Sequence, residues 1–393
     1  MSDNSENSYR SDTILTHAGN DPAANQGFIN PPVLHASTVL FPDTDHLTGK
    51  IVQKYKYGRR GTPTGDALET ALNQLEGAAG SILAPSGLGA ISVALLSCLK
   101  SGDHLLVTDN AYGPTRRVCE GVMKRFGIEV TYYDPMIGAD IESLIQPNTT
   151  AVFTESPGSL TFEMQDVDAI ADVAHRHGAT VLMDNTWATP LFYRPLEHGV
   201  DLSIMAGTKY VVGHSDVMIG TVAANAKALP QLKATYGDLG QCVGPDDIYL
   251  ALRGLRTMGV RLRQHMASGL EIASWLLTHP QVTRVLHPGL ESDPGHAMWK
   301  RDFSGASGLF ALELKPGSDA AVAAFLDGLG LFGLGYSWGG YESLATWPNP
   351  QNSRSVTTWE ADGPLIRLHI GLEDTEDLKA DLEAGLQRYA ATT

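Results

Sequence analysis

Short apolar segments alternate with helix-like segments from residue 66 onward, and this alternation constrains the fold more than any other feature of the chain. Leu68, Leu72 and Leu75 recur at helical spacing and mark the first helix. The expected helices are residues 66–75, 87–96 and 167–175, and the expected strands are 81–84, 104–109, 127–133, 151–155 and 180–183. This alternation predicts an α/β fold in which a mostly parallel sheet is flanked by helices.

Residues with useful chemistry stand at the ends of the apolar segments, where a strand gives way to a loop. They are Ser86, Gly87, Tyr112, Glu155, Asp184 and Lys209. In sheets of this kind, ligands bind beyond the carboxyl ends of the strands. We therefore expect these six residues, which are scattered in the sequence, to converge on one site.

Asp184 and Lys209 suggest the chemistry of that site. An apolar run ends in Asp184, and about one βαβ step later a second apolar segment ends in Thr208 and Lys209. This arrangement suits a pyridoxal 5'-phosphate (PLP) enzyme, in which the lysine holds the cofactor as a Schiff base. The aspartate would pair with the pyridinium nitrogen, Thr208 would reach the phosphate, and Tyr112 would stack on the ring. The alternative is an ordinary solvated lysine that follows a strand.

Arg367 interrupts the apolar segment 365–370. A guanidinium is costly to bury unless it is paired, and the α-carboxylate of an amino-acid substrate is a suitable bidentate partner. Pairing with a carboxylate of the protein itself is the alternative.

A dinucleotide-binding site is the rival interpretation. Residues 87–92 nearly match the glycine fingerprint of such sites, and Asp109 follows about 20 residues later, where a ribose-binding acid is expected. Two features oppose an NAD-dependent oxidoreductase: Ser92 replaces the third glycine, and the fingerprint usually lies on the first strand. The same helix N-terminus would equally bind a single phosphate.

Charge and composition exclude several partners and compartments. The net charge of −16 repels nucleic acid and anionic lipid, and no apolar run approaches the ~20 residues of a spanning helix. The three cysteines, Cys98, Cys119 and Cys242, are scattered without metal-ligand spacing, so no metal site is expected. The polar first ten residues contain no signal-peptide core. These observations predict a cytoplasmic protein.

Three parts are expected along the chain. Residues 1–60 have little periodicity and form an arm, and the basic and aromatic stretch 55–64 comes near its end. We interpret this stretch as an anion-binding tip in preference to a solvated loop. Residues 61–245 form the α/β domain, and 246–393 form a smaller α+β domain that begins with a long helix from Asp246 to His279. The other elements expected there are strands 282–286, 309–314 and 365–370, helix 319–326, and a last helix that starts near Asp374.

Five segments carry a resemblance to a known family. They are residues 57–62, 184–187, 206–210 with 213–216, 336–343 and 366–371. Over nearly its whole length the chain resembles the Cys/Met-metabolism family of PLP-dependent enzymes, of fold type I. The segment Tyr336-Ser337-Trp338-Gly339-Gly340 is similar to the branch that eliminates at Cβ.

The resemblance implies a role for each matching residue. Lys209 binds the cofactor and moves the Cα proton, Asp184 binds the pyridine nitrogen, and Tyr112 stacks on the ring. The residues implied for the phosphate are Gly87, Leu88 and Thr208, together with Tyr57 and Arg59 of a neighbouring subunit. Those implied for the substrate are Ser337 and Arg367, on its carboxylate, with Tyr336 and Trp338 shaping the pocket. Many relatives have serine where this chain has Ala206, so one phosphate hydrogen bond is expected to be missing.

The implied reaction is cleavage of L-cystathionine, or a related thioether, to homocysteine, pyruvate and ammonia in methionine biosynthesis. The implied assembly is a homotetramer of dimers with shared active sites. A γ-elimination or γ-replacement enzyme of the same family is the main alternative, and a catalytically silent PLP-binding regulator is a third.

Overall fold

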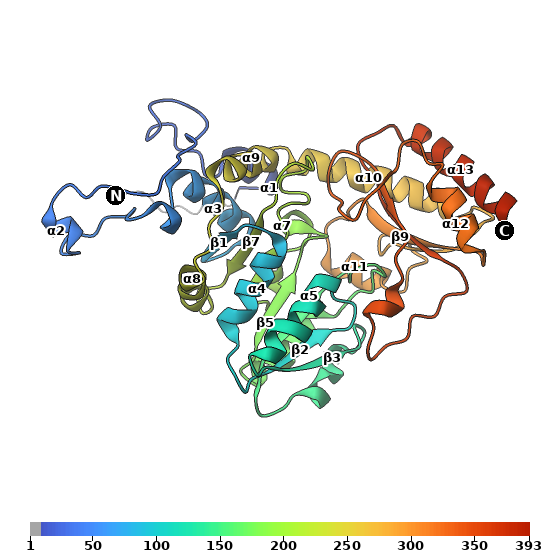
Figure 1. Ribbon diagram of the computed structural model, residues 1–393, viewed down its shortest axis with the longest axis horizontal. Coiled ribbons are helices and arrows are strands. Elements are labelled where there is room, and N and C mark those ends of the chain that lie inside the picture. Colours follow the sequence, from blue (N-terminus) through green and yellow to red (C-terminus); the bar gives the residue numbers. More distant parts are fainter. Residues whose placement is uncertain (1–8) are drawn as a thin grey trace.

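The computed structural model describes residues 9–393 (Figure 1). Its larger part is built on a seven-stranded sheet with the order β1-β7-β6-β5-β4-β2-β3. The strands are β1 (Gly80–Ala84), β2 (His104–Thr108), β3 (Glu129–Tyr133), β4 (Thr149–Glu155), β5 (Thr180–Asp184), β6 (Leu202–Met205) and β7 (Gly220–Ala224). Strands β3, β2, β4, β5 and β6 are parallel, and β7 runs antiparallel to both β6 and β1. The predicted mostly parallel sheet is confirmed, and the antiparallel strand β7 was not predicted.

Helices cover both faces of this sheet. They are α3 (Pro63–Glu76), α4 (Gly87–Cys98), α5 (Gly113–Val118), α6 (Val167–Arg176), α7 (Thr189–Phe192) and α8 (Leu229–Asp238), with short helical turns at Gly58–Arg60, Cys119–Met123, Gly138–Leu144 and Pro195–His198. Consecutive residues of a strand point to opposite faces. On β4, Val152 packs in the same buried cluster as Leu72 of α3, whereas Phe153 packs with Leu95 of α4. The alternation predicted from the sequence therefore gives a three-layer α/β/α body.

The smaller C-terminal part contains a five-stranded sheet with the order β10-β11-β12-β9-β8. Its strands are β8 (Val282–Leu286), β9 (Leu309–Leu314), β10 (Gly333–Leu334), β11 (Leu344–Thr346) and β12 (Leu365–His369). Its helices are α9 (Pro245–Leu255), α10 (Met258–Leu277), α11 (His296–Asp302), α12 (Asp319–Leu326) and α13 (Thr375–Thr392), with a turn at Pro350–Ser353. Figure 1 shows α12 and α13 at the far end of this part, and α10 running from it towards the α/β body.

The predicted single helix from Asp246 to His279 is wrong, because two helices, α9 and α10, occupy this stretch. The carbonyl of Gly254 accepts from the Thr257 backbone at 3.1 Å and from the Arg261 guanidinium at 2.7 Å. These contacts end the first helix, and hydrophobic periodicity cannot reveal them. Asp246 is not the N-cap, since Gly244 holds that position and Pro245 begins the helix.

The N-terminal residues divide into two pieces. Helix α1 (Ser11–His17) buries Ile14 and Leu15 in the main hydrophobic cluster, which the lack of periodicity did not predict. Further along, the chain leaves the body and carries the short helix α2 (Thr44–Leu47), which Figure 1 shows standing well away from the sheets. Large apolar side chains are exposed there: Phe28, Ile29, Leu40, Leu47 and Val52. Between residues 9 and 393, no helix is long and apolar enough to span a membrane.

Candidate active site

A cavity of about 420 Å³ opens beyond the carboxyl ends of the central strands. All six strand-end residues named from the sequence line it, namely Ser86, Gly87, Tyr112, Glu155, Asp184 and Lys209. Leu88, Thr208, Trp338 and Arg367 line it as well. The parallel sheet thus brings residues that are as far apart as 86 and 209 to one edge, and the C-terminal part closes the cavity with Trp338 and Arg367.

Lys209 follows β6 and points its amine into this cavity. Its Nζ donates to Ser337 Oγ at 2.8 Å and lies 5.3 Å from the ring centre of Trp338. Burial and then the positive charge of Arg367 lower the pKa of Lys209 to about 8, and the negative charge of Asp184 opposes them. About a tenth of the Lys209 amine is therefore neutral at pH 7, far more than for an ordinary lysine, and the neutral amine is the form that acts as a nucleophile or a base.

Asp184, at the end of β5, is a buried carboxylate. It accepts from the Thr186 backbone at 2.9 Å and from the Thr186 hydroxyl at 2.5 Å. Burial raises the pKa of Asp184, while the hydrogen bonds from Thr186 and the charge of Lys209 lower it. No ion pair reaches this carboxylate from the other residues described, so a cationic ligand nitrogen would offset its burial.

Glu155 lies beside Asp184, because these two residues are in register on β4 and β5. Burial, and then the negative charge of Asp184, raise the pKa of Glu155 well above its usual value, whereas the Tyr112 backbone amide lowers it. That amide donates to Glu155 Oε2 at 2.8 Å. Glu155 therefore anchors the start of α5 and the Tyr112 ring at the cavity edge.

The N-terminus of α4 forms another wall of the cavity. Ser86 caps this helix by accepting from the Gly89 backbone at 3.0 Å. A Cβ added to Gly87 would lie only 2.6 Å from the methyl carbon of Ala206, so only glycine permits this close approach. The Thr208 hydroxyl bonds to both backbone groups of Ile219, at 3.1 Å to the oxygen and 2.9 Å to the nitrogen. Free amides at a helix N-terminus attract a phosphate.

Arg367 on β12 faces the cavity from the C-terminal part. Its Nη2 donates to the Tyr336 carbonyl at 2.8 Å, and burial lowers its pKa to about 10. None of the carboxylates between residues 9 and 393 forms an ion pair with it, so the alternative of a protein carboxylate partner is not what this structure shows. The guanidinium retains donors for an anionic ligand.

Four of the predicted site residues are not among those that line the cavity of their own chain. Tyr336 is 91% exposed, and Tyr57 and Arg59 lie on the N-terminal segment. Arg59 Nη1 donates to the Gly237 carbonyl at 2.9 Å, away from Lys209. A fourth, Ser337, is absent from the lining but contacts Lys209 directly.

Sequence reasoning missed several lining residues. They include Arg117, Pro157, Ser159, Leu160, Phe162, Met218 and Leu309. Arg117 forms no hydrogen bond or ion pair with the other described residues, and its position one turn into α5, five residues after Tyr112, is the signal that could have found it. Leu160 and Phe162 belong to a loop without periodicity, which gives no such signal.

The dinucleotide interpretation is wrong, and Asp109 shows why. Its side chain is fully buried and accepts from the backbone amides of residues 355–357 at 2.8–3.1 Å. Arg116 pairs with the same carboxylate at 2.9 Å. With these partners, Asp109 has no oxygen left for a ribose. In contrast, the cavity supplies an amine, a buried carboxylate and a helix N-terminus, which together fit PLP.

The comparisons with known proteins agree with this chemistry. The family model described as "Cys/Met metabolism PLP-dependent enzyme" matches residues 12–387. A protein of Rhizobium johnstonii is 57% identical over 383 residues, which cover 96% of both chains. A protein of Escherichia coli named cystathionine beta-lyase is 44% identical over 387 residues, covering 96% of this chain and 98% of its own. A crystal structure of cystathionine gamma synthase from Xanthomonas oryzae, in complex with aminoacrylate and cysteine, superposes with a TM-score of 0.91 at 36% identity, over 98% of this chain and 100% of that one. The chain belongs to the Cys/Met metabolism family of PLP-dependent enzymes.

Proposed function

We propose that this protein is a cystathionine β-lyase, which cleaves L-cystathionine by β-elimination to homocysteine, pyruvate and ammonia in methionine biosynthesis. One observation carries the proposal. The amine of Lys209, with its pKa lowered to about 8, contacts Ser337 at 2.8 Å in a cavity that also holds Asp184 and Arg367. The 44% identity with the E. coli enzyme of that name supports the choice of reaction.

The cofactor-binding roles follow from position. Lys209 would carry PLP, Asp184 would pair with its ring nitrogen, and Tyr112 would stack on the ring. The phosphate would lie at the N-terminus of α4, against Gly87 and Leu88, with Thr208 beside it. When bound, PLP supplies an electron sink for a carbanion at the substrate Cα.

The substrate-binding roles belong to the C-terminal part. Arg367 would bind the α-carboxylate bidentately, and Ser337 would add a hydrogen bond. Neutral Lys209 would then take the Cα proton, and the homocysteine thiolate would leave from Cβ and be protonated. Hydrolysis of the released aminoacrylate by water would give pyruvate and ammonia. Trp338 and Tyr336 would shape the pocket around the thioether.

The position of Lys209 favours β-elimination over γ-chemistry. Elimination at Cβ needs one deprotonation, at Cα, whereas γ-elimination or γ-replacement needs a second, at Cβ, and a base free to move there. The Trp338 ring, whose centre lies 5.3 Å from Lys209 Nζ, narrows the space for that movement. The γ-synthase structure at 36% identity keeps the γ-enzymes as the second candidate.

Product analysis tests the proposal. L-Cystathionine is incubated with the purified holoenzyme, and the keto acid and thiol are identified by chromatography. Pyruvate with homocysteine is the expected pair. Dominant 2-oxobutyrate with cysteine would assign the chain to the γ-branch, and a yellow protein that releases neither keto acid would be the silent regulator.

Cofactor loading has an expected pH dependence. Only the neutral amine of Lys209 attacks the PLP aldehyde, so the loading rate of the apoenzyme should rise about tenfold per pH unit below the pKa and level off above it. We expect the midpoint near pH 8, where the pKa of Lys209 lies. Arg367→Ala should move the midpoint upward, because the charge of Arg367 lowers that pKa. Stopped-flow absorbance measures the loading rate, and hence the midpoint, for both proteins. A midpoint near pH 10 for the unaltered chain would contradict the lowered pKa of Lys209.

We also propose that active sites are shared between subunits of a homotetramer built from dimers, acting in the cytoplasm. Tyr57 and Arg59 are placed away from their own cavity, on a segment whose apolar side chains Phe28, Leu40 and Val52 are exposed. If a second copy of the chain covers these side chains, the basic stretch 55–64 would reach the phosphate-binding site of that copy. In the same proposal, residues 1–60 are the arm, 61–245 the PLP-binding domain and 246–393 the C-terminal domain.

Subunit mixing tests the shared site. Lys209→Ala and Arg59→Ala chains should each be nearly inactive, but co-refolding them creates hybrid dimers in which one site has neither defect. Random pairing should restore about a quarter of the wild-type activity. A mixture as inactive as its components would show that Arg59 serves its own subunit or has no role in the site.

A further inference from the structure

Residues 158–162, which follow β4, form one wall of the cavity, and their backbone is strained. Leu160 has φ of 70° and Phe162 has φ of 59°, and both residues line the cavity. Residues other than glycine rarely adopt this left-handed conformation, and it persists only when neighbouring groups hold it. The shape of the wall therefore depends on its supports.

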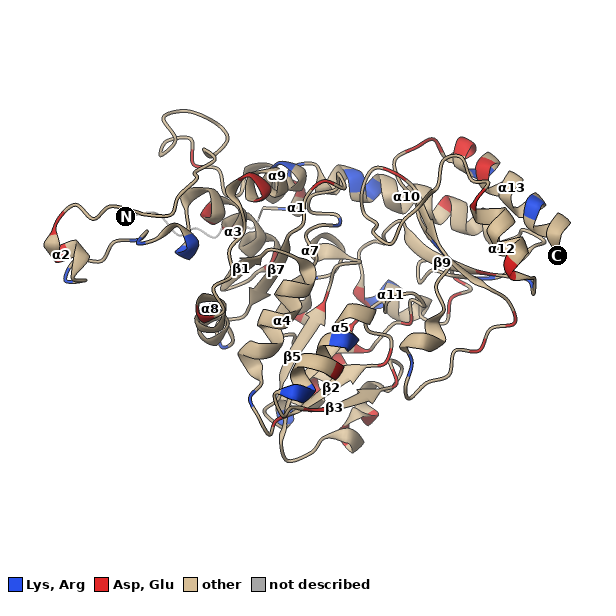
Figure 2. Cartoon of the chain, viewed as in Figure 1, with Lys and Arg blue, Asp and Glu red and all other residues tan. Residues whose placement is uncertain are grey.

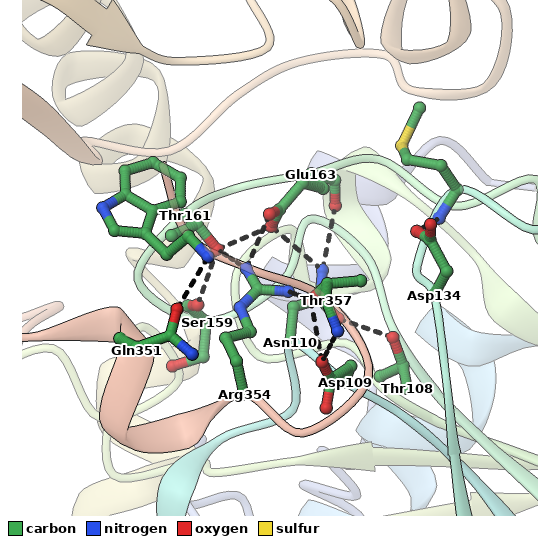
Figure 3. Close-up of polar contacts among 12 residues, drawn as sticks. Thr108, Asp109, Asn110, Asp134, Ser159, Thr161, Glu163, Gln351, Arg354 and Thr357 are labelled. Carbon is green, nitrogen blue, oxygen red and sulfur yellow. Dashed lines mark hydrogen bonds and ion pairs between the residues drawn. The ribbon is translucent and has the colours of Figure 1, made fainter. Parts of the chain in front are cut away.

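Glu163 and Thr161 hold the wall from within (Figure 3). The Thr161 hydroxyl donates to Glu163 Oε2 at 2.6 Å, and the Asn110 side chain donates to the same oxygen at 3.3 Å. The Asn110 carbonyl also accepts from the Ser159 backbone at 2.9 Å. These bonds tie the loop to the end of β2.

Arg354 supplies the third support and comes from the other part of the protein. Its Nη2 donates to the Thr161 hydroxyl at 2.5 Å and to Glu163 Oε1 at 2.6 Å (Figure 3). The Arg354 side chain is only 4% exposed. A buried guanidinium that joins two groups of one loop fixes their relative position.

The neighbours of Arg354 are fastened to the α/β body by Asp109. The Ser355 and Thr357 hydroxyls each donate to this carboxylate at 2.7 Å, in addition to the backbone amides of residues 355–357. Burial raises the pKa of Asp109, but hydrogen bonds from Thr357 and Ser355 outweigh burial and lower it to about 2. The loop between β11 and β12 is therefore attached to the α/β body beside the cavity wall, ten residues before the strand residue Arg367.

Figure 2 shows Lys, Arg, Asp and Glu positions spread over the helices and loops of both parts of the protein. The side chains of two such residues, Arg354 and Asp109, are buried where the two parts meet. Burying charged groups is costly, so such an arrangement is expected where it fixes a geometry.

We propose that Arg354 is a positioning residue. It fixes the cavity wall 158–162 where this wall contacts the distal half of the thioether substrate, the half that leaves as the thiolate. Arg367 lines the cavity from one side, and the apolar residues Leu160 and Phe162 line it from this wall. A substrate with a long thioether arm meets the wall, and one without such an arm does not. The inference rests on the proposed β-elimination and deepens it, since it names what selects the length of the substrate.

The test compares two substrates and two arginine variants of the holoenzyme. L-Cystathionine has a distal half, whereas 3-chloro-L-alanine undergoes the same elimination without one. Arg354→Ala should raise KM for L-cystathionine by about tenfold, leave kcat within about twofold, and change KM for 3-chloro-L-alanine by less than about twofold. Arg284→Ala is the matched control, because Arg284 anchors the same loop at the Glu360 carbonyl, 2.8 Å away, and is not among the residues that line the cavity.

Equal losses on both substrates, an equal effect of Arg284→Ala, or no effect of Arg354→Ala would each overturn the inference. If Arg354→Ala does not fold, Thr161→Val removes the hydroxyl that Arg354 binds while leaving the Arg354–Glu163 pair, and the same substrate selectivity is expected.

Amide hydrogen exchange adds a readout independent of turnover. Residues 158–163 should exchange faster in Arg354→Ala and not in Arg284→Ala. If wild-type enzyme fails to cleave L-cystathionine while this exchange difference holds, the proposed function fails and the wall support stands; if L-cystathionine is cleaved and exchange is unchanged, the wall support fails alone.

Discussion

Replacing Lys209 with alanine should lower the rate of pyruvate formation by at least about 10³-fold, because covalent binding of the cofactor and proton transfer at Cα are both lost. Lys209 is the only lysine among the residues that line the cavity, so no other described amine lies ready to replace it. The loss should appear in kcat at saturating substrate. Added methylamine should restore part of the proton transfer, which a simple folding defect would not allow.

Lys227→Ala is the matched control, because Lys227 is an exposed lysine outside the cavity. This variant should retain wild-type kcat and KM. A Lys209→Ala protein that keeps a tenth of the wild-type rate would contradict the assignment of Lys209.

Arg367→Ala has the second largest expected effect, a loss of about 2–5 kcal/mol of transition-state binding measured from kcat/KM. Among residues 9–393, the guanidinium bonds only to the backbone carbonyls of Tyr336 and Ser337, so its removal leaves none of the described carboxylates unpaired. We therefore expect the defect to lie mainly in KM, with little change in the melting temperature. Arg367→Lys keeps the positive charge but not the planar guanidinium, so its kcat/KM should lie between those of the wild-type enzyme and Arg367→Ala.

An unchanged KM for Arg367→Ala would mean that the substrate carboxylate binds elsewhere, and Arg117 would be the first residue to examine. A large fall in melting temperature with unchanged KM would instead make Arg367 a structural residue.

The sequence predicts the regular part of the fold well, because its signals are local. Helix α12 occupies the predicted residues 319–326, and strand β8 the predicted 282–286. Strand β7 was missed, since Gly220–Ala224 is a short run of small residues with no distinctive pattern, and its antiparallel direction depends on neighbours far along the chain. The break after α9 was missed because it depends on hydrogen bonds to the Gly254 carbonyl from the Thr257 backbone and the Arg261 side chain.

Some residues of the candidate site could likewise be predicted from the sequence, and others could not. Asp184 and Lys209 could be placed together because the parallel strands that precede them end at one edge of the sheet. Asp109 was misread, since an acid after a strand looks the same whether it binds a ribose or the amides of residues 355–357. Long-range contacts such as Lys209 with Ser337, and Arg354 with Glu163, join residues more than 120 positions apart and leave no local pattern.

Borohydride reduction of the purified holoenzyme, followed by peptide mass spectrometry, tests the central claim most directly. Reduction converts a cofactor held by a lysine into a stable secondary amine, so the modified residue can be read from the peptide masses. The account predicts a phosphopyridoxyl group on Lys209, and none on the exposed Lys227. A group found on another lysine, or a colourless protein that gains no such mass, would contradict it.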